Sequence, residues 1–297
     1  MSLSTYWYQH NKTVESYTGQ LFSDWSDNFS TEFKASYRDY TAERVVPSNL
    51  PSIQIFFGDA TSTTNGTRVS GDSLYFGTEV NSQGNYLRTK TWNYTGSGTW
   101  TLGDHDLKFG ADYATNDIYN LYSAQAWGVY TFWAGAADAN GNHALTNFQN
   151  GRWATYNHRT EYSPGSFAAD YKNSNLGLFI QDTWYVSPNL TLTLGVRGDR
   201  PDVSPEPRYN ALADQVFGYD NSQVFSGDFL VQPRFGFNYT FNSERPMQVR
   251  GGVGLFQGDA PQVWIGNSYA NNGYNYAQLQ ATAYDPTLRF SPDGNNQ

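Results

Sequence analysis

The sequence contains no cysteine, and charged residues make up only 15% of its 297 residues. The absence of cysteine excludes disulfides, thiolate metal sites and thiol nucleophiles. The charged fraction is well below the roughly 25% of an average globular protein. No apolar run approaches the ~20 residues that a membrane-spanning helix needs, which excludes a helical membrane protein. Lysine and arginine form no cluster and the net charge is −9, so we expect no nucleic-acid partner.

Aromatic residues, by contrast, are abundant: 23 Tyr, 19 Phe and 9 Trp make up 17% of the chain. The mean hydropathy is nonetheless −0.63, because Asn, Ser, Thr, Gln and Gly replace the missing charged residues. Apolar and polar residues alternate with period 2 over long stretches, and helical periodicity is weak throughout. This pattern predicts an all-β protein.

The predicted strands come in four pairs, each joined by a short polar turn. The pairs cover about 14–24 with 29–40, 86–102 with 106–121, 171–186 with 190–200, and 228–241 with 247–257. The connections between pairs are far longer and cover about 41–73, 122–168, 201–227 and the residues from 258 onward. Short turns that alternate with long loops are typical of an outer-membrane barrel. We therefore expect residues 1–297 to form one antiparallel, up-and-down transmembrane β-barrel segment of about eight strands, with short periplasmic turns and long extracellular loops.

The segment from Leu190 to Asp199 alternates strictly between apolar and polar side chains. Its ten residues match the ~9–11 of a transmembrane strand rather than the ~5–6 of a typical soluble strand. Alternation alone fits both a soluble sheet and a barrel wall, whereas this length favours the membrane. We expect the following residues to face lipid: Leu190, Leu192, Leu194, Val196, Phe235 and Phe237. We expect Arg197, Arg234 and Arg250 to face the lumen. There they either contact the plug or the substrate, or have a structural role and pair with carboxylates of the loops and the plug.

Large aromatic residues stand beside each of the short turns. Tyr and Trp gather where a bilayer meets water, because one end of each ring is apolar and the other polar. We therefore expect an interfacial girdle at the short-turn end of the barrel, formed by Trp25, Trp100, Trp184, Tyr185 and Tyr239.

The third hairpin, LGLFIQDTWYVSPNLTLTLGVRGD at 176–199, resembles a hairpin common in the barrels of TonB-dependent transporters. The matching positions are Gln181, Asp182, Trp184, Val186, Pro188, Leu190, Leu192, Gly195, Arg197 and Asp199. The next hairpin, with QPRFGFNYTF and VRGGVGLFQG, is similar to the strands that follow in the same family. The loops, rich in Tyr, Trp and Asn, look most like those of the Oar-like subgroup. The resemblance is specific over about 170–257 and only architectural over 1–165.

This resemblance implies a location in the bacterial outer membrane and a 22-stranded barrel with an N-terminal plug. Its implied partners are outer-membrane lipid, the plug domain and the TonB complex, and its substrate is a large or scarce molecule such as a peptide, a protein or a carbohydrate. The sequence contains no segment like a plug, no TonB box and no terminal barrel strand that ends in an aromatic residue, so we expect a piece from the middle of a barrel. We expect neither enzymatic activity nor a cofactor.

Other motifs carry weaker signals for chemistry. The four histidines show no metal-ligand spacing, and the glycine-rich run at 250–258 follows no βα pattern, so we expect a crowded or bent strand there rather than a nucleotide loop. DANGN at 138–142 and an acidic set contain the oxygen ligands that calcium takes, but solvated loops are the simpler interpretation. The acidic set is Asp199, Asp202, Glu206, Asp214, Asp220 and Asp228. The aromatic segments 126–135 and 267–278 suit either ligand contact or ordinary loop packing.

Three alternatives remain open at this point. A passive porin would need a charged eyelet and no plug. A soluble β-sandwich or propeller that binds carbohydrate requires Leu192, Leu194, Phe235 and Phe237 to be buried between sheets. A β-rich glycoside hydrolase requires two carboxylates about 5–9 Å apart in a cleft.

Overall fold

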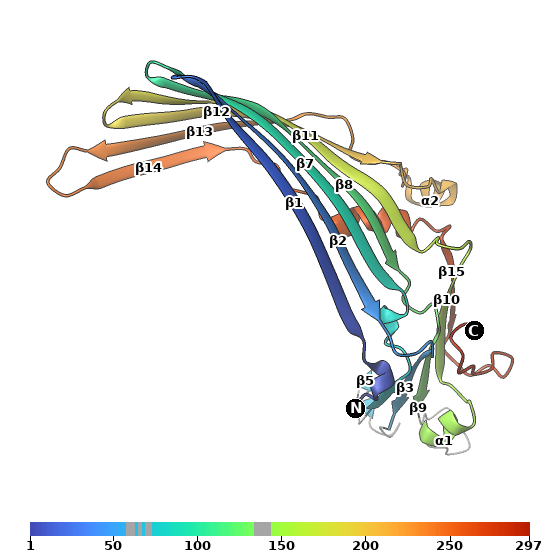
Figure 1. Ribbon diagram of the computed structural model, residues 1–297. Coiled ribbons are helices and arrows are strands. Elements are labelled where there is room, and N and C mark those ends of the chain that lie inside the picture. The colour runs from blue at the N-terminus through green and yellow to red at the C-terminus, as the bar shows by residue number, and fades with distance from the viewer. Residues whose placement is uncertain (58–62, 65–66, 69–72, 134–143) are drawn as a thin grey trace.

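Eight antiparallel strands form one long curved sheet, which we call the wall sheet (Figure 1). The computed structural model describes residues 1–57, 63–64, 67–68, 73–133 and 144–297. The strands follow one another in the order β1-β2-β7-β8-β11-β12-β13-β14. Their bounds are β1 Gln9–Ser26, β2 Phe29–Val45, β7 Asn85–Leu102, β8 His105–Tyr122, β11 Ala168–Ser187, β12 Leu190–Ser204, β13 Leu230–Phe241 and β14 Met247–Gly254.

All four predicted hairpins are present in the wall sheet, and the number of strands is as expected. Each hairpin is closed by its predicted turn, which marks what we call the short-turn end of the sheet. Gly103 adopts φ +62°, a backbone conformation that favours glycine in a tight turn. Several strands run further than predicted toward the opposite, loop end; β2, for example, continues to Val45 rather than ending near residue 40.

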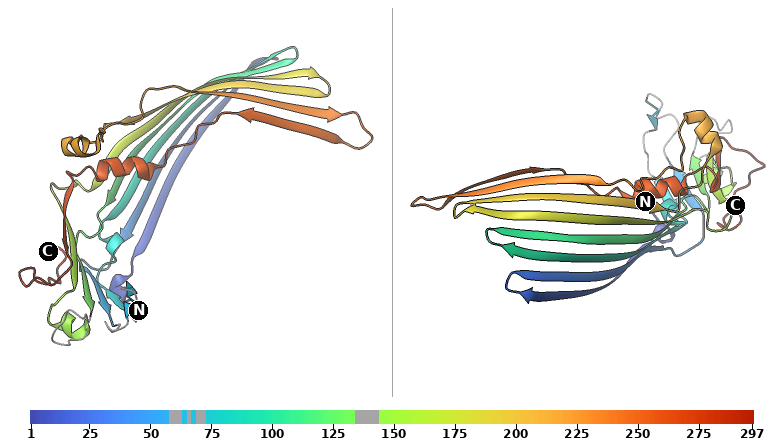
Figure 2. Two further views of the ribbon diagram at one scale, coloured as in Figure 1. Left: turned by 180° about the vertical axis from the view of Figure 1, so that it is seen from behind. Right: turned by 90° about the horizontal axis from the view of Figure 1, so that it is seen from above.

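The wall sheet is open rather than closed on itself. Strands β1 and β14 lie at its two edges, and among the described residues they do not pair with each other. Seen from above, the strands lie side by side from the blue edge to the orange edge (Figure 2). The sheet is therefore a segment of barrel wall, as the sequence predicts.

The long connections lie at one end of the wall, and parts of them form a second sheet that the sequence did not predict, which we call the end sheet. Its strand order is β15-β10-β9-β3-β6, and β3 pairs with β9 in parallel. The bounds are β3 Ser52–Phe56, β6 Ser73–Phe76, β9 Val129–Trp133, β10 Thr155–Glu161 and β15 Tyr276–Ala281, with a two-stranded sheet of β4 Thr63–Thr64 and β5 Thr67–Arg68.

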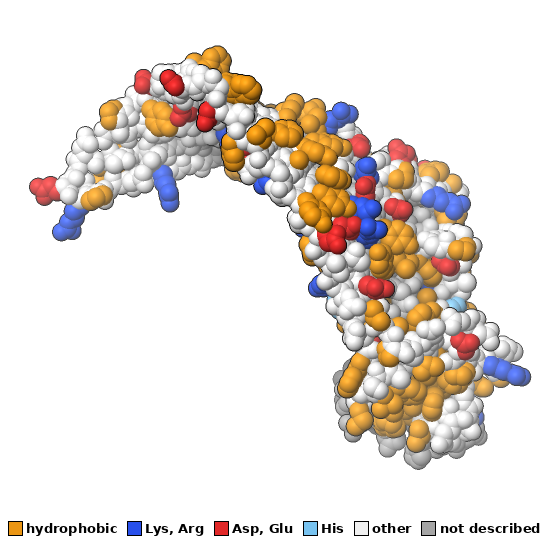
Figure 3. Space-filling view, viewed as in Figure 1, with side chains coloured by type: hydrophobic (Ala, Val, Ile, Leu, Met, Phe, Trp, Pro, Cys, Tyr) orange, Lys and Arg blue, Asp and Glu red, His pale blue; other side chains and the backbone are white. Residues whose placement is uncertain are grey.

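Aromatic packing holds the end sheet together. Tyr130, Phe132, Trp153 and Tyr156 are almost fully buried in one cluster, and the Tyr130 and Tyr156 rings stack at 4.5 Å. Hydrophobic side chains gather visibly over this sheet at the lower right of Figure 3. The segment 126–135 thus contributes core strand β9, and its residues 134 and 135 lie outside the described residues.

Five short helices complete the described chain. They are η1 Ser4–Tyr6, η3 Val80–Ser82, α1 Ala144–Gln149, α2 Ala211–Phe217 and α3 Gln262–Ala270. Within the part of the chain that the structure describes, no helix is both long and apolar enough to cross a bilayer.

Candidate functional site

The two faces of the wall sheet differ in character. Residues paired across neighbouring strands share a face, and neighbours along a strand point to opposite faces. One face contains a cross-strand row of Glu32, Ser97, Gly110, Phe179, Arg197 and Gln232. Helix α3 packs on this face, where the Tyr171 hydroxyl donates to the Gln262 carbonyl at 2.9 Å. Because α3, the red helix of Figure 2, lies inside the curve of the wall, this polar face is the concave one.

Arg197 is the centre of a hydrogen-bonded network on the concave face. Its Nη1 and Nη2 atoms donate to the two carboxylate oxygens of Asp112 at 2.6 and 2.9 Å. Its Nε and Nη2 atoms also donate to Asp199 at 2.7 and 2.6 Å. Asp199 is 4% exposed and accepts further hydrogen bonds from Asn175 and Gln232. Such bidentate, charge-assisted pairs are strong and fix geometry, so Arg197 is bound to carboxylates of the wall strands themselves.

The Arg197–Asp112 contact crosses the intervening strand β11 at Gly177. Gly177 pairs with both Asp112 and Asp199, and a Cβ atom on it would lie 2.1 Å from Arg197 Nη2 and 2.7 Å from Asp112 Oδ2. Only a glycine leaves room for the guanidinium group to lie across the strand here.

We therefore expect Gly177→Ala to lower the free energy of unfolding by about 1–3 kcal/mol, the usual range for overpacking. Equilibrium unfolding by urea in lipid vesicles measures this change. Gly19→Ala is the matched control, because a Cβ on Gly19 meets no atom within 4 Å. If Gly177→Ala and Gly19→Ala have the same free energy of unfolding, the close approach of Arg197 and Asp112 to Gly177 is contradicted.

The other two predicted lumen residues also lie on the concave face. Arg234 pairs with Gly195, and Arg250 pairs with Asn238. The Arg234 guanidinium lies 4.6 Å from the centre of the Phe256 ring, whereas Arg250 is exposed on the edge strand. The three arginines thus share a face, but only Arg197 belongs to a carboxylate network.

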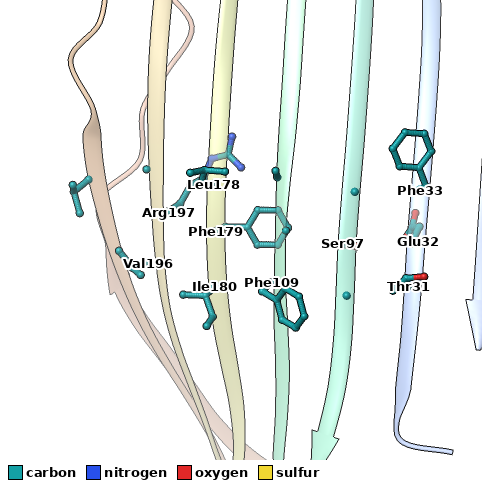
Figure 4. Close-up of a pocket in the computed structure, with 16 residues that line it drawn as sticks. Thr31, Glu32, Phe33, Ser97, Phe109, Leu178, Phe179, Ile180, Val196 and Arg197 are labelled. Atoms are coloured by element: carbon teal, nitrogen blue, oxygen red, sulfur yellow. The ribbon is translucent and has the colours of Figure 1, made fainter. Parts of the chain in front are cut away.

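The six residues predicted to face lipid lie together on the opposite, convex face. The soluble-sandwich alternative requires four of them to be buried, yet Leu194 and Phe235 are 44% and 41% exposed, and Leu192 and Phe237 are partly exposed. A groove of about 840 Å³ crosses this face over small residues, bordered by side chains such as Phe33, Leu178 and Ile180 (Figure 4). The sandwich alternative is therefore wrong.

The predicted girdle residues divide between the faces. Trp100 and Trp184 lie on the convex face near the short turns, as does Tyr239, which pairs with Leu190. Trp25 is 69% exposed at the short-turn end of β1. Tyr185, next to Trp184 along β11, points to the concave face instead and donates its hydroxyl to Asp106 at 3.0 Å.

A second aromatic belt, which the sequence did not predict, crosses the convex face closer to the loop end. It consists of Tyr17, Tyr37, Trp92, Tyr94 and Tyr113. The members come from four strands and become neighbours only through the cross-strand register, so no single hairpin shows the belt.

The two belts are separated by about the thickness of a membrane. Phe29, which pairs with Trp100, and Tyr37 are eight positions apart on β2, or about 27 Å along a strand at ~3.4 Å per residue. A strand tilt of ~35–45° reduces this to roughly 20 Å, close to the ~25 Å apolar band of outer-membrane barrels. Just beyond the second belt, Arg88 forms an ion pair with Asp39 at 2.6 Å.

The histidines, the acidic residues and the glycine-rich run gave the weaker chemical signals. No group of three or more potential metal ligands occurs among the described residues, and 138–142 and His143 lie outside them. His105 Nδ1 lies within hydrogen-bond distance of Asp182 Oδ2, at 2.7 Å, and its ring stacks on Trp184. In the end sheet, burial lowers the pKa of His158. A Cβ on Gly251 would lie 2.9 Å from the Phe237 ring, which confirms the crowded-strand interpretation of the glycine-rich run.

Comparison with known proteins identifies a family for this chain. The family model described as outer membrane beta barrel domain matches residues 5–295. Among solved structures, the copper transporter OprC is similar with a TM-score of 0.47 and 14% identity, over 91% of this chain and 36% of that one. This chain therefore spans little more than a third of that transporter. No curated protein matches. From the family match over nearly its whole length, the chain belongs to the outer membrane β-barrel domain family, whose place is the bacterial outer membrane.

Proposed function

We propose that this chain forms part of the barrel wall of a TonB-dependent transporter of the Oar-like kind. In the intact protein a plug domain fills the lumen and couples to the TonB complex. A large or scarce substrate, such as a peptide, a protein or a carbohydrate, binds at the loop end and passes through the lumen. The wall supplies shape and polarity rather than covalent chemistry, so the proposal includes no enzymatic activity and no cofactor.

The observation that carries this proposal is the contrast between the two faces of one wall. The convex face bears an apolar band between two aromatic belts, whereas the concave face bears hydrogen-bonding and charged side chains along its length. A surface of that kind suits a water-filled or plugged passage. The resemblance of the hairpin at 176–199 to TonB-dependent transporters supports the coupling to TonB.

A passive porin is the second candidate, and one observation favours it. Lys34 and Arg38 lie on the concave face, and neither forms an ion pair with any described residue. Free cations on a lumen wall are what a charged eyelet requires.

Conductance of the complete protein in a planar lipid bilayer separates the two candidates. We expect no steady KCl conductance from the complete protein, because a plug closes the lumen, and an open channel once the plug domain is deleted. A steady conductance from the unaltered protein would contradict the proposal and indicate a passive channel.

A further inference from the structure

A polar pocket of about 640 Å³ lies on the concave face beside the Arg197 network, with which it shares Asn175. Its floor is formed by β1, β2, β7, β8 and β11, and its rim by residues 257–262, which we call the strap. The strap connects β14 to α3. Pockets of roughly 300–1,000 Å³ are typical of sites for small molecules.

Hydroxyl and amide groups make up most of the pocket floor. One cross-strand row contains Thr18, Ser36, Asn93, Ala114 and Asn175, and the next contains Ser16, Arg38, Thr91, Asn116 and Asn173. Neutral groups that donate and accept in closely spaced rows match the hydroxyl groups of a saccharide.

Several polar groups of this floor have no partner among the residues that the structure describes. The Oδ1 atom of Asn175 is buried, and no described residue donates a hydrogen bond to it. Lys34 and Arg38 line the pocket and form no ion pair among the described residues, although the whole chain has a net charge of −9. Arg197, by contrast, is bound by two carboxylates. The pocket therefore holds two positive side chains that, unlike Arg197, are paired with no carboxylate of the described residues.

The strap is fixed at both ends and places one carboxylate at the rim. The backbone N–H of Gln257 donates to Gln232 Oε1 at 2.9 Å, and the carbonyl of Gln262 accepts from Tyr171. Asp259, between them, also lines the pocket, on a strap held to β13 and β11. An anionic group is thus favoured near Lys34 and Arg38, and neutral hydroxyl groups near Asp259, whose carboxylate accepts hydrogen bonds from them.

We propose that this pocket binds a saccharide that carries an acid group, either a carboxylate or a phosphate. The inference deepens the proposed function, on which it rests, by naming the class of substrate. The acid group binds at Lys34 or Arg38, which lie about 14 Å apart along β2 at ~3.4 Å per residue. The hydroxyl groups bind the rows that run from Ser36 to Asn175.

Equilibrium binding to the complete protein in detergent, measured by calorimetry, tests the proposal. The probes are a short oligogalacturonate, a phosphorylated disaccharide and a neutral oligosaccharide of the same length. We expect at least one of the two acidic probes to bind about tenfold or more tightly than the neutral one, and the better of the two identifies carboxylate or phosphate as the acid group. Equal affinity for acidic and neutral probes, or no binding of any probe, would overturn the proposal.

Variants locate the bound anion. Lys34→Gln combined with Arg38→Gln should lower the affinity for the acidic probe about tenfold or more, because charge-assisted hydrogen bonds are lost. The affinity for the neutral probe should not change. The control is Lys90→Gln, which removes one positive charge from the convex face of β7, outside the pocket. An equal loss in the control would overturn the assignment of the site. Binding in detergent requires no energised transport, so its failure leaves the bilayer conductance test of the proposed function unaffected.

Discussion

Replacing Arg197 with alanine is expected to lower the free energy of unfolding by about 3–5 kcal/mol, the range for removing one partner of a buried ion pair. The change leaves Asp112 and Asp199 without their shared cation, and Asp199 is almost fully buried. The Asn175 and Gln232 amides still donate to Asp199, but they do not cancel its charge.

Urea unfolding in lipid vesicles measures the free energy of unfolding of Arg197→Ala. Two further variants show whether its loss comes from the hydrogen-bonded network. Arg250→Ala, on the same face but exposed on edge strand β14, should change the free energy of unfolding by less than about 0.5 kcal/mol, as exposed substitutions usually do. Adding Asp199→Asn to Arg197→Ala should recover part of the loss, because it removes the buried charge. A loss in Arg250→Ala as large as that in Arg197→Ala would show that the network has no special role.

Placing a charge on the convex face is expected to have a similarly large effect. Leu178 is 46% exposed midway between the two aromatic belts, and Leu178→Arg should cost about 2–4 kcal/mol of unfolding free energy, as arginine does at the middle of a bilayer. Gln181→Arg is the matched control on the same strand, because residue 181 faces the concave side.

The same urea unfolding experiment compares these two variants, with folding checked by the electrophoretic shift between heated and unheated samples. We expect the control to lose less than about 0.5 kcal/mol. If both variants lose the same amount, or if Gln181→Arg loses more, the assignment of the convex face to lipid is contradicted.

The hairpins of the wall sheet could be predicted from the sequence because their determinants are local. The turns at 103–104 and 188–189 follow directly on alternating strands, so each strand's partner is its neighbour in the chain. The faces of these strands could be predicted for the same reason, since the side-chain period of two is exact.

The end sheet could not be predicted because its pairing is not local. Strand β3 pairs in parallel with β9, which lies far along the chain and after two wall strands. Both segments are short and mostly apolar, and a short apolar run carries no periodicity from which a partner could be identified. The aromatic residues of 126–135 therefore suited either ligand contact or loop packing, whereas the structure buries Tyr130 and Phe132 in a core.

The partners of Arg197 were missed for a related reason. Asp112 is two strands away from Arg197. The two side chains meet only because Gly177, on the strand between them, has no side chain in the way. A glycine flanked by Leu176 and Leu178 in an otherwise well-formed strand was the signal that could have indicated a close approach.

Accessibility of single spin labels along one wall strand tests the central claim most directly, and none of these 297 residues is a cysteine that would take up a second label. Labels would replace residues 178, 179, 180 and 181 in turn in the complete protein in lipid vesicles. The account predicts that labels at 178 and 180 collide mainly with oxygen, which partitions into lipid, and that labels at 179 and 181 are shielded from lipid oxygen. Uniform contact with a water-soluble relaxation agent at all four positions, or the opposite alternation, would contradict it.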